Sequence, residues 1–182
     1  MMSNAIFYIV KKTPISFEHN LPKNIVDYIN DKRGENNKDS LYAWNLLQKL
    51  TNADFKSVTF LKSGKPIIKG LNFSISHSYN YVAIAFTKSN ANFGIDLEKI
   101  RDKDLSFLSK LASKFSNKDT PILFRLWTEH ESTIKALNLN VFKDFDKNFK
   151  GLSKAINTID GEYSLSIYND SNLKIEELTY ED

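Results

Sequence analysis

Short runs of alternating apolar and polar residues constrain the fold of this chain more than any other feature. Residues 93–98 read FGIDLE, in which every second residue from Phe93 is apolar. Successive side chains of a β-strand point to opposite faces, so the pattern predicts a half-buried strand. Asp96 and Glu98 then share one face, about 6.6–6.8 Å apart at roughly 3.3–3.4 Å per residue. Two like charges placed side by side repel each other and need an explanation.

Similar patterns predict a mixture of helices and short strands along the whole chain. Short polar breaks between successive strands favour antiparallel pairing, and Asp39 or Ser40 is expected to cap the second helix. The fold class is therefore α+β, with an N-terminal half at 1–92 and a C-terminal half at 93–182. Strands are expected at 5–10, 57–61, 71–76, 81–87 and 92–98, a turn at 63–66, helices at 22–33, 39–50, 104–115 and 121–138, and a strand meander at 155–159, 163–168 and 173–178.

Composition and charge exclude several classes of protein. The 182 residues are 41% hydrophobic and contain no cysteine, so the chain should fold, without disulfides or cysteine-bound zinc. No apolar run approaches a membrane span, and AIFYIV at 5–10 is too short for a signal-peptide core. We therefore expect a cytoplasmic protein with no membrane partner. The net charge of +3 favours an acidic or phosphate-rich partner and is too small to indicate nucleic acid.

A second acidic position lies in the predicted helix 121–138. Trp127, Glu131 and Lys135 follow one another at i, i+4 and i+8 and lie along one side of that helix. The ordinary interpretation is an exposed Glu–Lys pair, with Asp96 and Glu98 as solvent-facing residues of an edge strand.

The functional interpretation is that Asp96, Glu98 and Glu131 meet around one divalent cation. Magnesium prefers hard oxygen ligands and leaves positions open for phosphate oxygens and water. Lys135 could then contact a phosphate oxygen as a point charge. Because spacing alone does not show that the strand and the helix meet, both interpretations stay open.

Residues 72–78 read NFSISHS and place His77 among three serines at a strand end. A histidine there commonly makes a local hydrogen bond to nearby serine or backbone groups. The alternative is a phosphate contact, since an imidazolium donates from both nitrogens and serine hydroxyls also donate.

Five stretches, taken together and in order, resemble the Sfp-type 4'-phosphopantetheinyl transferases. The resemblance runs from about residue 63 to residue 137. The stretches are SGKP (63–66), FSISHS (73–78), GIDLEKI (94–100), FSNKD (115–119) and WTEHESTIK (127–135).

The resemblance implies two similar α+β halves related by pseudo-twofold symmetry, with coenzyme A in the cleft between them. It also implies a magnesium ion, or manganese in its place. By the same resemblance, the metal ligands are Asp96, Glu98 and Glu131, the pyrophosphate contact is Lys135, the phosphate contacts are Ser76 and His77, and the contact beside the adenine is Lys65.

The activity implied is transfer of the phosphopantetheine arm of coenzyme A to a serine of an acidic acyl or peptidyl carrier protein. Glu131 is the first choice for the general base, and Asp96 and Lys135 are the other catalytic residues. The carrier would belong to fatty-acid, polyketide or nonribosomal-peptide synthesis. We expect a monomer, since two halves in one chain can form the cleft internally.

Two positions depart from the family pattern. His130 stands where a lysine is usual, and Asp39 stands where members often have an arginine. These departures motivate an alternative, a relative that binds coenzyme A or a carrier protein without catalysis. A weak nucleic-acid-binding module is a further alternative, although the basic residues do not gather in a stripe.

Overall fold

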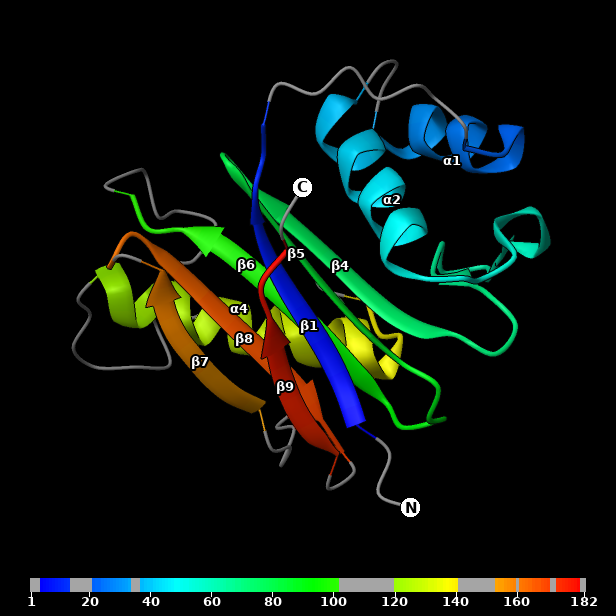
Figure 1. The fold of residues 1–182 in the computed structure, drawn as a ribbon. Helices are drawn as coiled ribbons and strands as arrows, with labels where there is room; N and C mark the ends of the chain where they lie inside the picture. Colours follow the sequence, from blue (N-terminus) through cyan, green and yellow to red (C-terminus); the bar gives the residue numbers. More distant parts are fainter. Residues whose placement is uncertain are drawn as a thin grey trace. The chain divides into compact units, whose positions relative to one another are not determined.

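The computed structural model describes residues 4–13, 21–33, 37–101, 120–140, 153–159, 161–170 and 173–180. This part of the chain has the α+β class expected from the sequence (Figure 1). The predicted helix at 104–115 and the FSNKD stretch lie outside the described residues. Contacts divide the chain into two units, one of residues 1–91 with 173–182 and the other of residues 92–172. The predicted division at residues 92 and 93 stays a prediction.

Unit 1 is built on a four-stranded sheet in the order β4-β5-β1-β9. The strands β4 (Asn72–Ser78) and β5 (Tyr81–Thr87) form an antiparallel pair, and β5 also pairs antiparallel with β1 (Asn4–Lys11). These three strands and the β4–β5 pairing confirm the sequence prediction. The fourth strand, β9 (Lys174–Leu178), runs parallel to β1.

The predicted meander of the last three strands is wrong in its third member. In unit 2, β8 (Tyr163–Asn169) lies between β6 (Phe93–Lys99) and β7 (Ser153–Ile159), and both pairings are antiparallel. Since β8 has a neighbour on each side, it offers no edge to β9. The last strand therefore pairs with β1, which still has an open edge.

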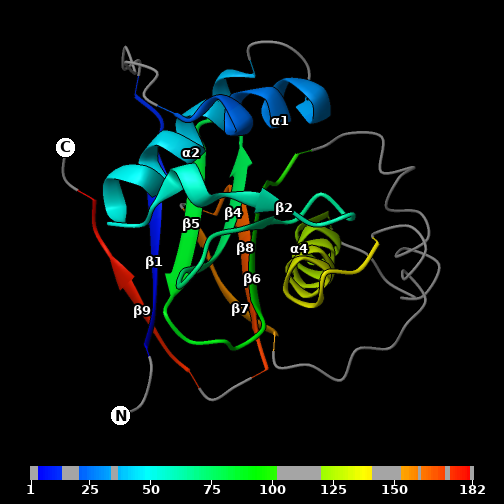
Figure 2. The ribbon, with the colours of Figure 1, turned by 90° about the vertical axis from the view of Figure 1, so that its right-hand side faces the viewer.

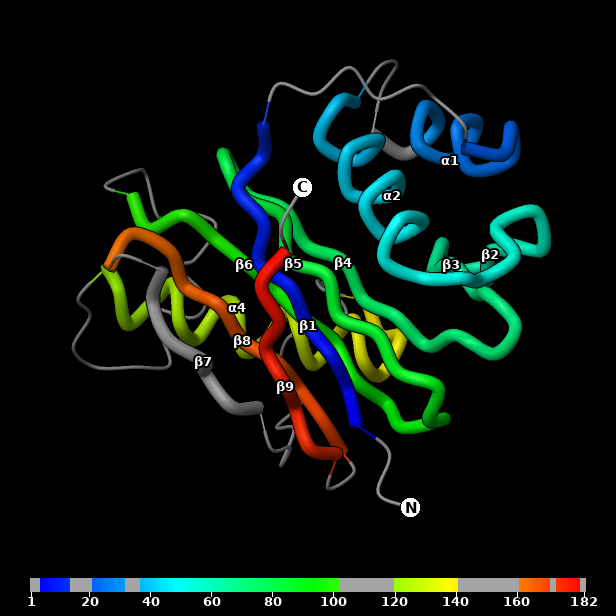
Figure 3. Tube along the Cα trace, viewed as in Figure 1, coloured from blue at the N-terminus to red at the C-terminus, as the bar shows by residue number. Residues whose placement is uncertain are grey.

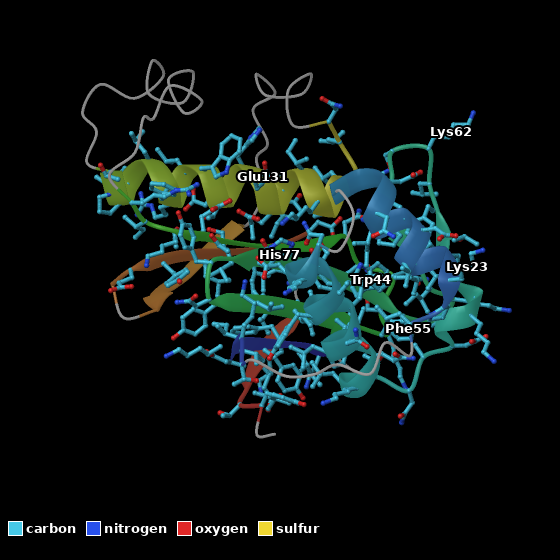
Figure 4. All side chains as sticks on the ribbon, turned by 90° about the horizontal axis from the view of Figure 1, so that it is seen from above. Lys23, Trp44, Phe55, Lys62, His77 and Glu131 are labelled. Atoms are coloured by element: carbon cyan, nitrogen blue, oxygen red, sulfur yellow. The ribbon has the colours of Figure 1, made fainter. Side chains whose placement is uncertain are left out.

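The helices α1 (Lys23–Arg33) and α2 (Lys38–Leu50) pack in unit 1 around an apolar core. The ring centroid of Trp44 lies 5.6 Å from that of Phe73 and 6.2 Å from that of Phe55. Figure 4 labels Trp44 and Phe55. Asn37 caps α2, and its side chain accepts a hydrogen bond from the Ser40 amide at 2.8 Å. The predicted cap at Asp39 or Ser40 is wrong because the helix begins before these residues.

A short hairpin follows α2 and the 3-10 turn Phe55–Ser57. Its strands are β2 (Thr59–Phe60) and β3 (Pro66–Ile67), which Figure 3 labels. A turn is present as predicted, although it lies at 62–63 and Pro66 already belongs to β3. Gly64 has a φ of +88°, which a glycine adopts without strain. The predicted strand at 57–61 is shorter in the structure, where β2 consists of Thr59 and Phe60.

The helix α4 (Thr120–Leu137) packs along β6 and β8 in unit 2, as Figure 2 shows. The whole run from Phe93 to Leu97 is buried, so the prediction of a half-buried strand is wrong. The reason is that α4 covers the face that carries Asp96. None of the described helices is long and apolar enough to cross a membrane.

Candidate functional site

Asp96 lies in the middle of β6, and its side chain is only 4% exposed. The Lys135 ammonium on α4 donates to Asp96 Oδ1 at 2.6 Å and to the Ile95 carbonyl oxygen at 3.2 Å. A charged group is rarely buried unless it is paired. The structure therefore joins two of the predicted site residues, although they are 39 positions apart in the sequence.

Gly94 explains how α4 comes close enough for this contact. A Cβ atom at position 94 would overlap the Ser132 carbonyl oxygen and lie 2.7 Å from the Ala136 nitrogen. Its φ is not positive, so the glycine is needed for the close approach of helix and strand and not for a turn. The same close approach of α4 and β6 brings the Lys135 ammonium within hydrogen-bond distance of Asp96.

Three hydroxyl groups form a buried cluster beside Asp96. Thr128 Oγ1 on α4 lies 2.8 Å from Ser166 Oγ and 3.0 Å from Ser164 Oγ on β8. Thr128 also donates to the Arg125 carbonyl oxygen at 2.9 Å. A hydroxyl has one hydrogen and two acceptor positions, so both serines donate to Thr128. Each of the three hydroxyl hydrogens thereby has an acceptor.

Glu98 and Glu131 belong to the same polar layer. Asp96 pairs with Ser166 in register, and Glu98 pairs with Ser164, so both acids face α4. On the helix, Glu131 follows Thr128 by three residues and precedes Lys135 by four, which places all three on one side. Figure 4 labels Glu131 on this helix. Both glutamates are half-buried.

Within the described residues, no group of three or more acidic, histidine or cysteine side chains is arranged to hold a metal ion. The structure brings Asp96 and Lys135 into contact and places Glu98 and Glu131 in the same layer between α4 and the sheet. The magnesium ligand set therefore stays a prediction. His130 lies beside Trp127, with 6.1 Å between ring centroids, and its Nε2 is buried.

The other predicted contacts lie in unit 1. His77 Nε2 is 3.3 Å from Ser40 Oγ in the first turn of α2. Ser76 precedes His77 in β4, so its side chain points to the opposite face of the strand. Lys65 lies in the hairpin, and burial lowers the pKa of its ammonium below the usual 10.5.

Asp39 stands where the family often has an arginine, and Lys12 forms an ion pair with it at 2.6 Å. The Lys12 ammonium, in the residue after β1, thus lies beside the first turn of α2. Lys12 was not singled out from the sequence, because residues 12 and 39 are brought together only by the fold.

The hydroxyl cluster was also missed. One signal for it exists in the sequence: residues 163–168 read YSLSIY, where Ser164 and Ser166 alternate with apolar residues in a strand. This alternation resembles that of Asp96 and Glu98 in FGIDLE, and the two strands prove to be neighbours. Thr128 carries no such signal, since a threonine inside a helix has no preferred partner.

Comparison with known proteins points in one direction. No family model matches the chain. A curated relative, the 4'-phosphopantetheinyl transferase gsp of Aneurinibacillus migulanus, is 32% identical over 108 residues, which cover 53% of this chain and 45% of the relative. The chain thus spans less than half the length of the relative that it matches. It is similar over that stretch to a 4'-phosphopantetheinyl transferase.

Proposed function

We propose that this protein transfers the 4'-phosphopantetheine arm of coenzyme A to a serine of an acyl or peptidyl carrier protein and releases 3',5'-ADP. The observation that carries the proposal is the buried pair of Asp96 and Lys135 between β6 and α4. These residues belong to the GIDLEKI and WTEHESTIK stretches, which resemble the transferase family. The similarity to the transferase of Aneurinibacillus migulanus supports the same activity.

The residues present fit a magnesium or manganese ion in their chemistry. Asp96, Glu98 and Glu131 offer carboxylate oxygens, the hard ligands that these ions prefer. All three belong to the layer between α4 and the sheet of unit 2. When bound, the ion would polarise phosphate oxygens and offset their growing negative charge.

The reaction is a displacement at phosphorus. The serine oxygen of the carrier forms a bond to the phosphorus that bears the pantetheine arm. The bond from that phosphorus to the bridging oxygen breaks, and this oxygen leaves with 3',5'-ADP. Glu131 takes the serine proton, directly or through a water molecule. Lys135 supplies a positive charge to the pyrophosphate oxygens as negative charge develops on them.

Unit 1 would bind the remaining anionic groups of coenzyme A. His77, Ser40 and Lys12 gather at the first turn of α2, where backbone amides and the helix dipole favour a phosphate. Ser76 and Lys65 are the other proposed contacts. A pseudo-twofold relation between the halves, a monomeric state and a cytoplasmic location belong to the same proposal.

The alternative is a protein that binds coenzyme A or a carrier without catalysis. One observation favours it: Asp39 occupies the position of a frequent family arginine and engages Lys12 in an ion pair. This pair partly neutralises the cation that would otherwise replace the arginine. The retained Asp96, Glu98, Glu131 and Lys135 argue for catalysis, since binding alone does not require the whole set.

Intact-protein mass spectrometry of an apo-carrier protein tests the proposal. Incubation with this protein, magnesium and coenzyme A should add one phosphopantetheine group per carrier. The variants Asp96→Asn and Lys135→Met should lose this activity, whereas Asp27→Asn, an exposed aspartate on α1, should keep it. No mass gain with intact coenzyme A binding would favour the alternative, and neither gain nor binding would overturn both.

A further inference from the structure

The hydroxyl cluster of Thr128, Ser164 and Ser166 takes no part in the proposed displacement at phosphorus. Thr128 and Ser166 are 0% exposed, and Ser164 is 4% exposed. A buried hydroxyl group must keep its hydrogen bonds, whereas an alanine or a valine would occupy such a place without this requirement. Packing alone therefore does not explain why three hydroxyl groups meet at this interface.

Each serine of the cluster lies beside an acidic residue of the candidate site. In the antiparallel pairing of β6 and β8, Ser166 lies directly opposite Asp96, and Ser164 lies directly opposite Glu98. Residues that lie opposite each other in neighbouring strands share a face of the sheet. The two serines therefore belong to the same face as the two acids, and this face is the one that α4 covers.

Thr128 differs from the other buried hydroxyl groups of α4. Ser132 and Thr133 are also buried, and their hydroxyls donate to the Glu129 carbonyl oxygen at 3.0 Å and 2.8 Å. Such bonds stay within the helix and do not connect it to another element. Thr128 makes a bond of this kind to the Arg125 carbonyl oxygen and in addition accepts hydrogen bonds from the two serines of β8. Its hydroxyl oxygen is thus a cross-link between α4 and β8.

Glu131 lies between two cross-links from α4 to the sheet. Thr128, three residues before it, is bonded to β8, and Lys135, four residues after it, is bonded to Asp96 on β6. A helix that is held at one point can still rotate about its axis or slide along the strands. Two contacts with different strands oppose both movements. The position of the Glu131 backbone relative to Asp96 and Glu98 therefore depends on both cross-links.

We infer that Thr128 is a positioning residue, which holds Glu131 where it can share one divalent cation with Asp96 and Glu98. The inference rests on the proposed function, because that proposal makes the three carboxylates the metal ligands. Thr128 acts through the backbone of α4 and does not itself touch the cation. Groups that fix the orientation of metal ligands commonly contribute about 10- to 100-fold to metal affinity.

Binding of Mn²⁺, measured without turnover from the electron paramagnetic resonance signal of the free ion, tests the inference. Thr128→Val should raise the Kd for Mn²⁺ by about tenfold or more. Thr128→Ser keeps the hydroxyl oxygen and should restore most of the affinity. The double variant Ser164→Ala with Ser166→Ala removes both donors and should weaken Mn²⁺ binding as Thr128→Val does.

Thr133→Val is the matched control for Thr128→Val. It makes the same substitution at a buried position of the same helix, but the lost hydrogen bond lies within α4. The Kd for Mn²⁺ should therefore stay at the wild-type value. Thermal unfolding of each variant gives a temperature at which all of them are folded, and binding is compared there.

The magnesium dependence of transfer gives a second measurement. Thr128→Val should need about tenfold more magnesium than the wild type for half-maximal transfer, in proportion to the weaker binding of the ion. Thr133→Val should keep the wild-type dependence. An unchanged dependence in Thr128→Val would overturn the inference.

The outcomes separate a failure of the inference from a failure of the proposed function. Equal Kd values for Mn²⁺ in Thr128→Val and Thr133→Val, with normal transfer by the wild type, would overturn the positioning role and leave the proposed function standing. An equal loss in both would assign the effect to the stability of α4 and not to the cross-link. A wild type that neither binds Mn²⁺ nor transfers phosphopantetheine would overturn the proposed function, and the inference with it.

Discussion

The two units cover their sheets in different ways. In unit 1, α2 meets the sheet mainly through apolar side chains, with Leu47 almost fully buried and Trp44 against Phe73, and α1 packs against α2. In unit 2, α4 meets β6 and β8 across a layer that contains a carboxylate, an ammonium and three hydroxyl groups. Both interfaces are well buried, so the difference is in chemistry and not in exposure.

This difference supports the proposed location of the chemistry in unit 2. Burying a polar group is costly unless it is hydrogen-bonded, and burying a charge costs more. An interface whose only role is to stabilise the fold is expected to be mainly apolar, as in unit 1. The polar layer of unit 2 is therefore in keeping with the proposed role of Asp96 and its neighbours.

The largest loss of stability is expected from opening the apolar interface. Trp44→Ala should lower the free energy of unfolding by about 3–5 kcal/mol, because it removes a buried indole and leaves a cavity. Chemical denaturation measures this loss. Transfer activity at a temperature where the variant is folded should change less than stability does. A loss below about 1 kcal/mol would mean that unit 1 does not depend on this packing.

Gly94→Ala should separate α4 from β6 and damage the polar interface directly. The added Cβ would overlap the helix backbone, which cannot move as a flexible side chain can. We expect a loss of about 1–3 kcal/mol in the free energy of unfolding, as for other overpacked sites. Transfer should fall further than in Trp44→Ala, since Lys135 moves relative to Asp96. Wild-type activity and stability would contradict the close approach.

Thr128→Val tests the hydroxyl cluster with almost no change in shape. The valine offers no acceptor, so Ser164 and Ser166 lose their shared partner. The free energy of unfolding should fall by about 1–2 kcal/mol, in the range for unsatisfied buried hydroxyls. Thr128→Ser keeps the acceptor and should recover most of this loss in the same denaturation experiment. No loss in Thr128→Val would contradict the role of the shared hydrogen bonds.

The smallest expected change in the free energy of unfolding concerns Glu129, which lies on α4 beside Thr128. Burial raises the pKa of its carboxyl group above the usual 4.5, while Arg125, at 3.8 Å, acts in the opposite direction. The folded protein then holds this proton more tightly than the unfolded chain. The stabilisation from this group is present below about pH 4.5 and is lost as the pH rises through the higher value in the folded state.

Glu129→Gln should remove this loss, because glutamine does not titrate. Unfolding measured from about pH 4 to about pH 7 should show the wild type losing stability relative to the variant as the pH rises. A difference that is constant over this range would show that the carboxyl group has the same pKa in both states. Arg125→Gln should enlarge the pH dependence, since it removes the opposing charge.

Local patterns were sufficient for most of the individual elements. The helices at 22–33 and 121–138, the strands at 71–76 and 81–87 and a turn overlapping 63–66 were all predicted. Each rests on a short-range cause, such as helical spacing of apolar residues or a glycine in a turn. The cap of α2 was misplaced because Asn37, Asp39 and Ser40 are all good caps, and only the start of the helix distinguishes them.

The candidate site was predicted less completely than the elements. The sequence by itself determined that Asp96 and Glu98 share a strand face, that Glu131 and Lys135 share a helix face, and that both belong to stretches resembling one family. Only the tertiary structure decided that α4 covers this strand face, that Lys135 reaches Asp96, and that Thr128 joins Ser164 and Ser166. It also decided that β9 pairs with β1. The physical reason is that periodicity is set within a few neighbouring residues, whereas these contacts join residues 36 or more positions apart. Such contacts depend on which edge or face of a sheet is left uncovered by the other elements.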